Sequence, residues 1–397
     1  MCRTHNARAC FLVASLATLG AFIWQALLVY SLWSGNWTAL YRTGDHLPLA
    51  PLFPAGTQVF KGSAGYDAQY YRVVAYDPLY RKGGDRYVDD PRTRYRRPLV
   101  SFLAYGLAMG RPGWIDVTYT GVILALVFAG SWWACQLALQ HSRNVLWGLV
   151  FFIAPATLIG VNRLTIDIAL AAFCLGYVVL LGSRRLAPMW FLLAAACLVR
   201  ETGAILALAA AGAALWRKEW KKAGIFASSL LPALAWYVYT QLTLRMTFLA
   251  GRTMEVPSWV GNKPLLGILE RMASPVPYPT YPPEQVFFFQ TLDRLVLIGV
   301  LMAIWFAISW WKDRKLDAVK LAALGFALVP LIVSTQGVWR DVNGYGRFLT
   351  PMWLMVGMRG AREGRWIYWL PMLLVDLRLG VPLMSELLST FGFSIGQ

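Results

Sequence analysis

Charged residues are scarce in this chain. Only 14% of its 397 residues are charged, whereas soluble proteins carry about a quarter. Hydrophobic residues make up 58%, and apolar runs long enough to cross ~30 Å of hydrocarbon recur along the sequence. This composition excludes an ordinary soluble domain and predicts an all-α polytopic membrane protein. Because no long polar linker divides the sequence, we expect residues 1–397 to form a single transmembrane domain embedded in a lipid bilayer.

Patterns typical of metal sites and disulfide frameworks are also missing. The five cysteines are scattered, mostly within or beside apolar segments, and the three histidines are far apart. This spacing predicts neither a metal site nor a disulfide framework. The net charge of +17 must first be compared with the positive-inside rule, because basic residues in membrane proteins gather in cytoplasmic loops. We therefore expect no nucleic-acid partner.

The apolar runs predict about eleven transmembrane helices. They lie at about 11–32, 114–139, 145–161, 165–182, 187–199, 203–216, 223–243, 291–311, 318–335, 347–358 and 366–383. The first run follows Arg3 and Arg8 as in a signal peptide, but its length and the lack of a cleavage site indicate a retained anchor. A cytoplasmic N-terminus places the short Lys/Arg-rich loops in the cytoplasm, as the positive-inside rule requires.

Two large loops are extracytoplasmic in this arrangement, at residues 33–113 and 244–290. The first contains an apolar piece, 98–109, that is too short to span comfortably and is expected along the interface. The second contains seven prolines and several aromatic residues, which predict an irregular cover over the outer face. Several charged residues fall on that same face: Asp67, Arg96, Arg97, Asp167, Arg200, Glu201 and Arg347.

The first loop contains the stretch Gly65-Tyr66-Asp67-Ala68-Gln69-Tyr70-Tyr71. Asp67 is the candidate catalytic base, because a carboxylate among aromatic rings can accept a proton from an attacking hydroxyl. Tyr66, Gln69 and Tyr70 are candidate substrate-binding residues, since rings and amides are common partners of sugars. A solvated turn aspartate is the alternative. Three further aspartates are reserves: Asp77, which precedes Pro78 as turn residues do, and the neighbours Asp89 and Asp90.

Arginines form the second candidate group. Arg96 and Arg97 belong to a basic run, 92–97, that suits either a substrate phosphate or anionic lipid headgroups. Arg200 and Glu201 lie between two short apolar stretches, where embedded charges usually pair or contact a ligand. Asp167 opens the fourth crossing, where a carboxylate also complements the helix dipole.

The segment Asn343-Gly344-Tyr345-Gly346-Arg347-Phe348 precedes the tenth crossing. Its two glycines predict a sharp backbone turn. Arg347 would then stand where a helix enters the lipid, either binding a phosphate or snorkelling to headgroups. Tyr345 is a further candidate for substrate binding.

Five short motifs occur in one order: GYDAQYY, RYRRPL, NRLTID, RETG and GYGRFLTP. Over about residues 30–351 this pattern resembles bacterial GT-C glycosyltransferases, polytopic enzymes that use polyprenyl-phosphate-linked sugars to build cell-surface glycopolymers. The resemblance implies that a hexosyl or pentosyl group moves, with inversion, from such a donor to an extracytoplasmic glycan, lipid or protein. It also implies a location in the bacterial inner membrane, with the active site on the extracytoplasmic face.

The same resemblance assigns roles to individual residues. Asp67 matches the catalytic acidic residue that this superfamily carries in its first outer loop, and the donor phosphate would fall to Arg200, Arg347 or Arg163. The adjacent pair of acids found in some branches is missing beside Asp67. No cofactor is therefore predicted with certainty, and dependence on a divalent cation stays open.

Three other functions remain alternatives. An O-antigen polymerase or ligase would also be polytopic and rich in outer arginines. A lipid-linked-sugar flippase or other transporter would have charges deep within several helices and repeat symmetry, neither of which the sequence displays. A non-catalytic scaffold would not need Asp67.

Overall fold

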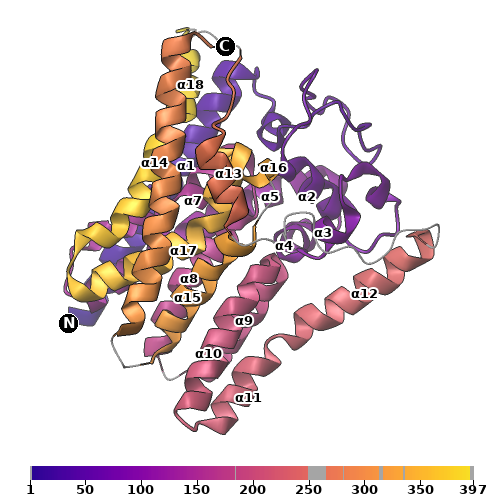
Figure 1. The fold of residues 1–397 in the computed structure, drawn as a ribbon. Helices are drawn as coiled ribbons and strands as arrows, with labels where there is room; N and C mark the ends of the chain where they lie inside the picture. The colour runs from indigo at the N-terminus through magenta and orange to yellow at the C-terminus, as the bar shows by residue number, and fades with distance from the viewer. Residues whose placement is uncertain are drawn as a thin grey trace.

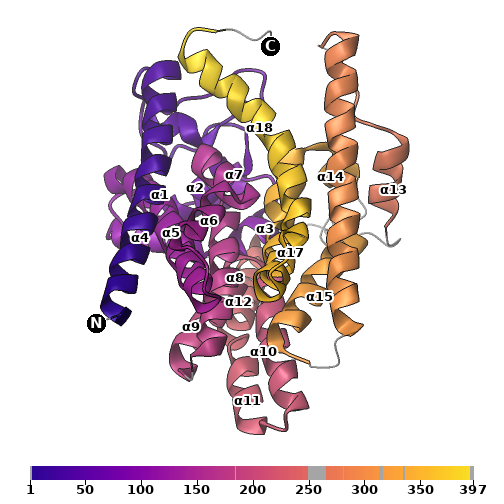
Figure 2. The same cartoon turned by 90° about the vertical axis from the view of Figure 1, so that its left-hand side faces the viewer.

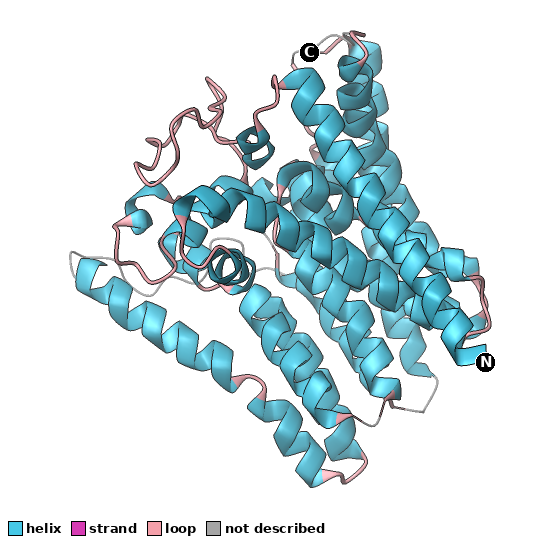
Figure 3. Cartoon of the chain, turned by 180° about the vertical axis from the view of Figure 1, so that it is seen from behind, coloured by secondary structure: helices cyan, strands magenta, loops and turns pink. Residues whose placement is uncertain are grey.

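The computed structural model describes residues 2–183, 185–248, 265–279, 281–312, 316–333 and 336–393. Throughout these segments the chain consists of helices and connecting loops without a named strand (Figure 3). A single isolated bridge pairs Gly44 with Phe60. The predicted all-α class is therefore confirmed for the described part of the chain.

Five stretches of helix are long and apolar enough to cross a membrane. They are α1 (Cys2–Leu32), α5 (Pro112–Gln140), α11 with α12 (Trp220–Ser228 and Leu231–Phe248), α14 (Pro283–Ser309), and the short η6 (Trp366–Trp369) with α18 (Leu370–Thr390). A sixth candidate is a pair bent by 60°, in which η3 (Val145–Leu149) and α6 (Val150–Ile153) precede α7 (Pro155–Arg163). These helices confirm the membrane character of the chain, judged by length and composition.

The count of eleven crossings is not confirmed, although helices occupy nearly all the predicted positions. Four of them are only 10–17 residues long: α8 (Asp167–Gly182), α9 (Leu186–Val199), α10 (Ala204–Trp216) and α15 (Ala318–Ile332). A helix rises 1.5 Å per residue, so about twenty residues are needed to span the hydrocarbon layer alone. The short helices do not meet that length individually.

Helix starts follow from local sequence. Pro112, Pro155 and Pro283 each stand in the first turn of a helix, where the missing N–H costs nothing. The carboxylate of Asp341 accepts the Asn343 N–H and so caps α17 (Val342–Glu363). Asp317 caps α15 in the same way, because an aspartate at this position satisfies otherwise unpaired N–H groups.

This cap corrects one prediction. Gly344 and Gly346 lie inside α17, and neither glycine has a positive φ. The predicted sharp turn before Arg347 is therefore wrong, because the helix begins at the Asp341 cap and continues through both glycines.

The first large loop is more ordered than the sequence suggested. It contains α2 (Asp67–Tyr76), α3 (Pro91–Tyr95) and α4 (Leu99–Leu107), together with the short η1 (Trp37–Tyr41) and η2 (Gly84–Tyr87). Asp67 is thus the first residue of a helix. This helix forms because Ala68, Tyr71 and Ala75 bury one face in the main core. The apolar piece 98–109 became α4, which packs on α2 and α5.

The long helices run side by side. α1 packs along α5 and touches α18, and α14 packs along α18. The start of α1 and the end of α18 lie at opposite ends of the bundle (Figures 1 and 2). Most of the predicted loop 244–290 lies either in α12, α13 (Leu266–Ala273) and α14 or outside the described residues. The irregular cover predicted there is therefore wrong for the helical parts, while residues 249–264 and 280 lie outside the described residues, as do the basic residues Arg184, Arg314 and Lys315.

Candidate active site

Asp67 lies between two arginines. It accepts a hydrogen bond from Arg94 Nη2 at 2.9 Å and another from Arg347 Nη2, and its side chain is 26% exposed. Burial raises the pKa of Asp67, but the guanidinium groups of Arg347 and Arg94 lower it more, so it lies well below its usual range. Asp67 is consequently ionised at neutral pH and is a weak base.

Arg347 connects Asp67 to Asp167. Its Nη1 donates to Asp167 Oδ2 at 2.8 Å, while the other oxygen of Asp167 accepts from Arg200 Nη1. Asp167 is only 3% exposed, and it opens α8 as the sequence predicted. Arg94, Asp67, Arg347, Asp167 and Arg200 therefore form one continuous chain of alternating charges.

Two further ion pairs flank this series of alternating charges. Arg97 Nε donates to Glu201 Oε2 at 3.0 Å, and its Nη1 donates to the Tyr71 hydroxyl at 3.2 Å. Asp89 accepts two hydrogen bonds from Arg94, at 2.6 and 2.7 Å. Four carboxylates are thus matched by four guanidinium groups, so this part of the site is electrically balanced. We call these eight residues the charge cluster.

A glycine fixes the junction that supplies Arg200 and Glu201. They lie where α9 ends and η4 (Glu201–Gly203) begins. A Cβ atom on Gly203 would lie 2.0 Å from the carbonyl oxygen of Ala196. No other residue fits at this position without moving the backbone of α9, so the glycine of the RETG motif lets the two charged residues approach the core closely.

Arg163 differs from the arginines of the charge cluster. Its guanidinium lies over the Tyr66 ring, 4.7 Å from the centroid, and Arg347 lies over the same ring at 5.0 Å. No described carboxylate forms a salt bridge with Arg163, and the buried hydroxyl of Tyr66 has no hydrogen-bond partner among the described residues. Arg163 and the Tyr66 hydroxyl are therefore available to a ligand directly beside Asp67.

A second positive group lies near Arg163. Arg42 Nη2 pairs with Glu386 Oε1 at 2.8 Å, and Glu386 Oε2 accepts from Asn162 Nδ2 at 2.8 Å. Burial lowers the pKa of Arg42, the charge of Glu386 raises it, and the nearby charge of Arg163 lowers it. Only Arg42 of these two arginines is paired with a carboxylate, so Arg163 leaves a surplus positive charge here.

An apolar cavity of about 490 Å³ lies between α1, α7 and α18. Its lining includes Trp24, Leu158, Val161 and Leu383. Val161 is two residues before Arg163, and the Trp24 indole donates to Asn162 Oδ1 at 3.3 Å. The apolar cavity therefore ends next to the surplus positive charge.

A larger cavity, of about 1300 Å³, lies on the other side of α18. Tyr278, Tyr281 and Phe289 line it together with polar residues that include Asp341 and Glu386. Glu386 belongs to the Arg42 pair, so this aromatic and polar cavity also borders the site. Rings and carboxylates in one cavity suit a ligand with many hydroxyl groups.

The structure brings some of the predicted site residues together in or beside the charge cluster and places others in separate contacts. Those in the charge cluster or beside it are Asp67, Tyr66, Arg97, Arg163, Asp167, Arg200, Glu201 and Arg347. The Gln69 amide instead accepts the Gly44 N–H at 3.0 Å and donates to the Ala64 carbonyl at 2.8 Å, which holds the loop in place.

Three other candidate residues make packing or capping contacts instead. The Tyr70 ring lies under Arg94, with 4.8 Å between the guanidinium carbon and the ring centroid. The Tyr345 ring packs on Trp339 at 5.4 Å. Arg96 ends α3 through its backbone N–H.

The reserve aspartates stabilise local structure. Asp77 accepts the backbone N–H groups of Arg81, Lys82 and Gly84, which confirms its predicted role in a turn. Asp90 caps α3. Among the described residues, no three His, Cys, Asp or Glu side chains gather as ligands for a metal ion.

The sequence interpretation missed Arg94, Arg42, Asn162 and Glu386 as site residues. Arg94 was part of the basic run, but Arg96 and Arg97 were selected from it. Arg94 lies inside α3, whereas Arg97 lies beyond its end, so helical spacing does not link these two arginines. Nothing local marks Glu386 as the partner of Arg42 either.

Comparison of the chain with models of protein families, with curated proteins and with solved structures found no match.

Proposed function

We propose that the chain is a membrane glycosyltransferase of the GT-C type, which moves a sugar from a polyprenyl-phosphate donor to a hydroxyl of an extracytoplasmic glycan, lipid or protein. The observation that carries the proposal is the placement of Arg163. It has no salt bridge to a described carboxylate, and it lies between an apolar cavity and the half-buried carboxylate of Asp67. The lipid chain of the donor, its phosphate and the catalytic base require an apolar cavity, a positive charge and a carboxylate in that order.

The apolar cavity between α1, α7 and α18 suits the first isoprene units of the donor. Its lining is almost wholly apolar, and it borders helices that are candidates for crossing the membrane. Burial of hydrocarbon here would hold the donor by the hydrophobic effect, with its phosphate beside Arg163.

Arg163 suits the donor phosphate better than Arg200 and Arg347 do. Arg347 and Arg200 are already balanced by Asp67 and Asp167, so a phosphate there would have to displace a buried carboxylate. Arg163 offers a guanidinium fork that can form two parallel hydrogen bonds to phosphate oxygens. The leaving phosphate gains negative charge during transfer, which favours a site with surplus positive charge.

The reaction then proceeds by direct displacement. The acceptor oxygen attacks the anomeric carbon, the bond from that carbon to the phosphate oxygen breaks, and the hydroxyl proton passes to Asp67 and then to solvent. A weak base suffices when positive charge develops on the sugar before the proton leaves, as in oxocarbenium-like transition states. The polyprenyl phosphate leaves with the bonding electrons, and the anomeric configuration inverts.

The acceptor would approach through the larger cavity on the other side of α18. Its aromatic rings, amides and carboxylates are groups that bind sugar hydroxyls and ring faces. This arrangement keeps the donor lipid and the acceptor on opposite sides of one helix.

The proposal includes the finer topology: eleven crossings, with residues 33–113 and the charge cluster on the extracytoplasmic face of a bacterial inner membrane. The short helices α8, α9, α10 and α15 would then be crossings surrounded by other helices. The opposite positions of the start of α1 and the end of α18 (Figures 1 and 2) suit an odd number of crossings.

Cysteine labelling tests this topology. Arg86→Cys and Lys221→Cys each introduce a thiol at an exposed position, and Cys10, Cys135, Cys174 and Cys197 are buried. An impermeant maleimide applied to intact spheroplasts is expected to label position 86 and not position 221. Labelling of position 221 alone would reverse the orientation.

Arg163→Lys tests the phosphate site. Lysine keeps the charge but loses the planar fork, so we expect the KM for a polyprenyl-phosphate sugar to rise roughly tenfold, as when one charge-assisted hydrogen bond is lost. The assay would use the purified protein and synthetic donors, chosen after mass spectrometry identifies the polyprenyl-phosphate sugar that accumulates in a deletion strain.

The matched control is Arg86→Lys, an exposed arginine in the same extracytoplasmic loop. This variant should leave the KM for the donor and the KM for the acceptor unchanged. If Arg163→Lys changed only the KM of the acceptor, Arg163 would not be the phosphate ligand.

A further inference from the structure

A third cavity lies where α5 and α17 both end. Its volume is about 170 Å³, roughly ten times the volume needed for a single water molecule. The end of α5, η3, the end of α17 and η6 enclose it. The charge cluster includes Asp167, the first residue of α8, and Arg347 in the second turn of α17, so this cavity lies at the opposite end of α17.

Two indole rings form the rigid walls of this cavity. The centroids of Trp147 and Trp369 are 6.4 Å apart, and Leu354 and Met358 complete the apolar lining. Trp369 packs into a notch of α17, because a Cβ on Gly357 would lie 2.6 Å from its ring. Trp147 is 46% exposed. An indole that is half buried in protein at the end of a membrane helix is typical of the interface with lipid headgroups.

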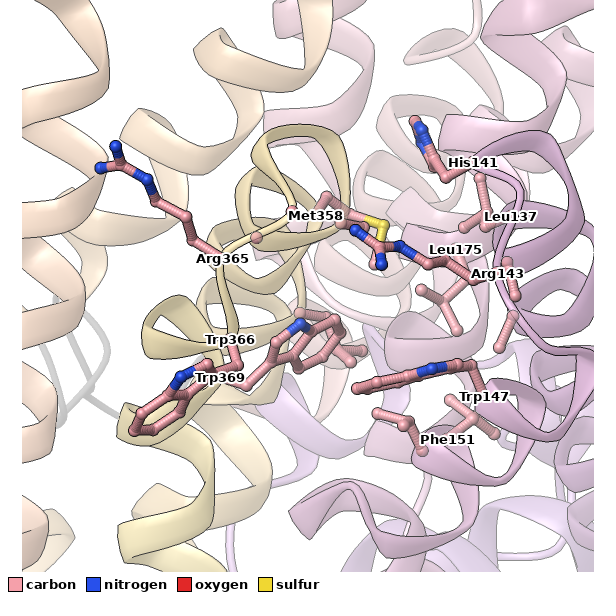
Figure 4. A pocket seen from close by; sticks show the side chains of 17 residues that line it. Leu137, His141, Arg143, Trp147, Phe151, Leu175, Met358, Arg365, Trp366 and Trp369 are labelled. Carbon is pink, nitrogen blue, oxygen red and sulfur yellow. The ribbon is translucent and has the colours of Figure 1, made fainter.

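The rim of the cavity is positively charged. Figure 4 shows Arg143 reaching across the cavity toward Met358, whereas Arg365 extends away from it. The two acids of this region are already paired, Glu363 with Arg359 at 2.7 Å and Asp317 with Arg362 at 2.8 Å. Among the described residues, no carboxylate forms a salt bridge with Arg143.

The backbone leaves space for Arg143. Gly364 ends α17 with a φ of +70°, and a Cβ at this position would lie 3.0 Å from Arg143 Nη2. Burial lowers the pKa of His141, and the charges of Arg362 and Arg143 lower it further. Burial is the larger cause, and the part contributed by the two arginines reflects a positive local field, which attracts an anion.

We propose that this cavity binds one anionic phospholipid of the adjacent leaflet, with its phosphate on Arg143 and its glycerol and upper acyl chain against the indole rings of Trp147 and Trp369. A phospholipid is the occupant that combines a phosphate with an apolar body, as the rim and the lining require. The site is separate from the proposed sugar transfer and does not depend on it.

Native mass spectrometry of the purified full-length chain tests this site. The probes are phosphatidylglycerol and phosphatidylcholine with identical acyl chains, added to delipidated protein in detergent. We expect one phosphatidylglycerol to bind at least roughly tenfold more tightly than any phosphatidylcholine, because the guanidinium–phosphate contact is charge-assisted.

Two variants locate the binding. Arg143→Ala removes the phosphate ligand, and Ala361→Phe fills the cavity while keeping Arg143. Each should abolish the tight phosphatidylglycerol. The matched control Arg217→Ala removes an exposed basic residue at the end of α10 and should leave the binding unchanged. Monodispersity and the melting temperature establish that each variant is folded.

Three outcomes would overturn the proposal. Equal losses in Arg143→Ala and Arg217→Ala would mean that only general surface charge attracts the lipid. Equal binding of phosphatidylcholine would mean that the cavity recognises acyl chains alone. Competition by inorganic phosphate at millimolar concentration would mean that the ligand is a soluble anion. If one variant fails to fold, the other still decides between these results.

Discussion

Asp67→Asn is expected to lower the rate of sugar transfer by roughly 10²-fold or more, the usual effect of losing a general base. The amide keeps the shape of the side chain and can still accept hydrogen bonds from Arg94 and Arg347, but it cannot take the acceptor proton. Donor binding should survive, because Arg163 rather than Asp67 contacts the phosphate in the proposed mechanism. Turnover would be measured with a synthetic polyprenyl-phosphate sugar.

Asp89→Asn provides the matched control. Asp89 also accepts hydrogen bonds from Arg94, at 2.6 and 2.7 Å, yet it is one step further from the proposed reaction centre than Asp67. Its substitution removes a comparable negative charge from the same network and should lower turnover only a few-fold. Equal losses in both variants would show that the network needs its charge balance, and they would remove Asp67 from the role of base.

Arg347→Met should destabilise the folded protein more than any other single substitution in the charge cluster. The side chain is 9% exposed and contacts both Asp67 and Asp167, and methionine fills similar volume without a charge. Removing one partner from buried ion pairs typically costs 3–5 kcal/mol. Because Arg94 and Arg200 still pair with the two aspartates, we expect about 3 kcal/mol, measured as a lower melting temperature in detergent.

Arg163→Met is the control for this prediction. Arg163 has no salt bridge to a described carboxylate, so its removal leaves no buried acid alone, and the melting temperature should change little. Activity should nevertheless be lost. If Arg163→Met were destabilised as strongly as Arg347→Met, the stacking of Arg163 on Tyr66 would be a structural contact rather than an open phosphate site.

Apolar run lengths were enough to predict most helices. The run at 114–139 became Pro112–Gln140, and the run at 187–199 became Leu186–Val199, because hydrophobic continuity and flanking charges mark membrane helices directly. Helix α2 was not predicted, because a sequence that combines tyrosines with small residues is also typical of a polar loop. Its helical form depends on the core beneath it.

The charge cluster could be anticipated only in part. That Asp67, Asp167, Arg200 and Arg347 share one face was predicted from the expected orientation of the helices, but their pairings were not. Arg347 lies 280 residues after Asp67 and 180 after Asp167, and no local rule selects partners at such separations. The distinction between the balanced Arg347 and the available Arg163 likewise needed the three-dimensional arrangement.

The separation of these partners in the sequence has a consequence for biosynthesis. A ribosome delivers Asp67 and Asp167 long before Arg347, so a growing chain carries aspartates in the cluster that still lack one of their final partners. The balanced state is reached only after α17 has docked. A chain truncated before residue 342 would retain this imbalance permanently, and quality-control proteases that recognise unassembled polar groups in the membrane should remove it. The charge cluster therefore acquires its full set of ion pairs only at a late stage of assembly.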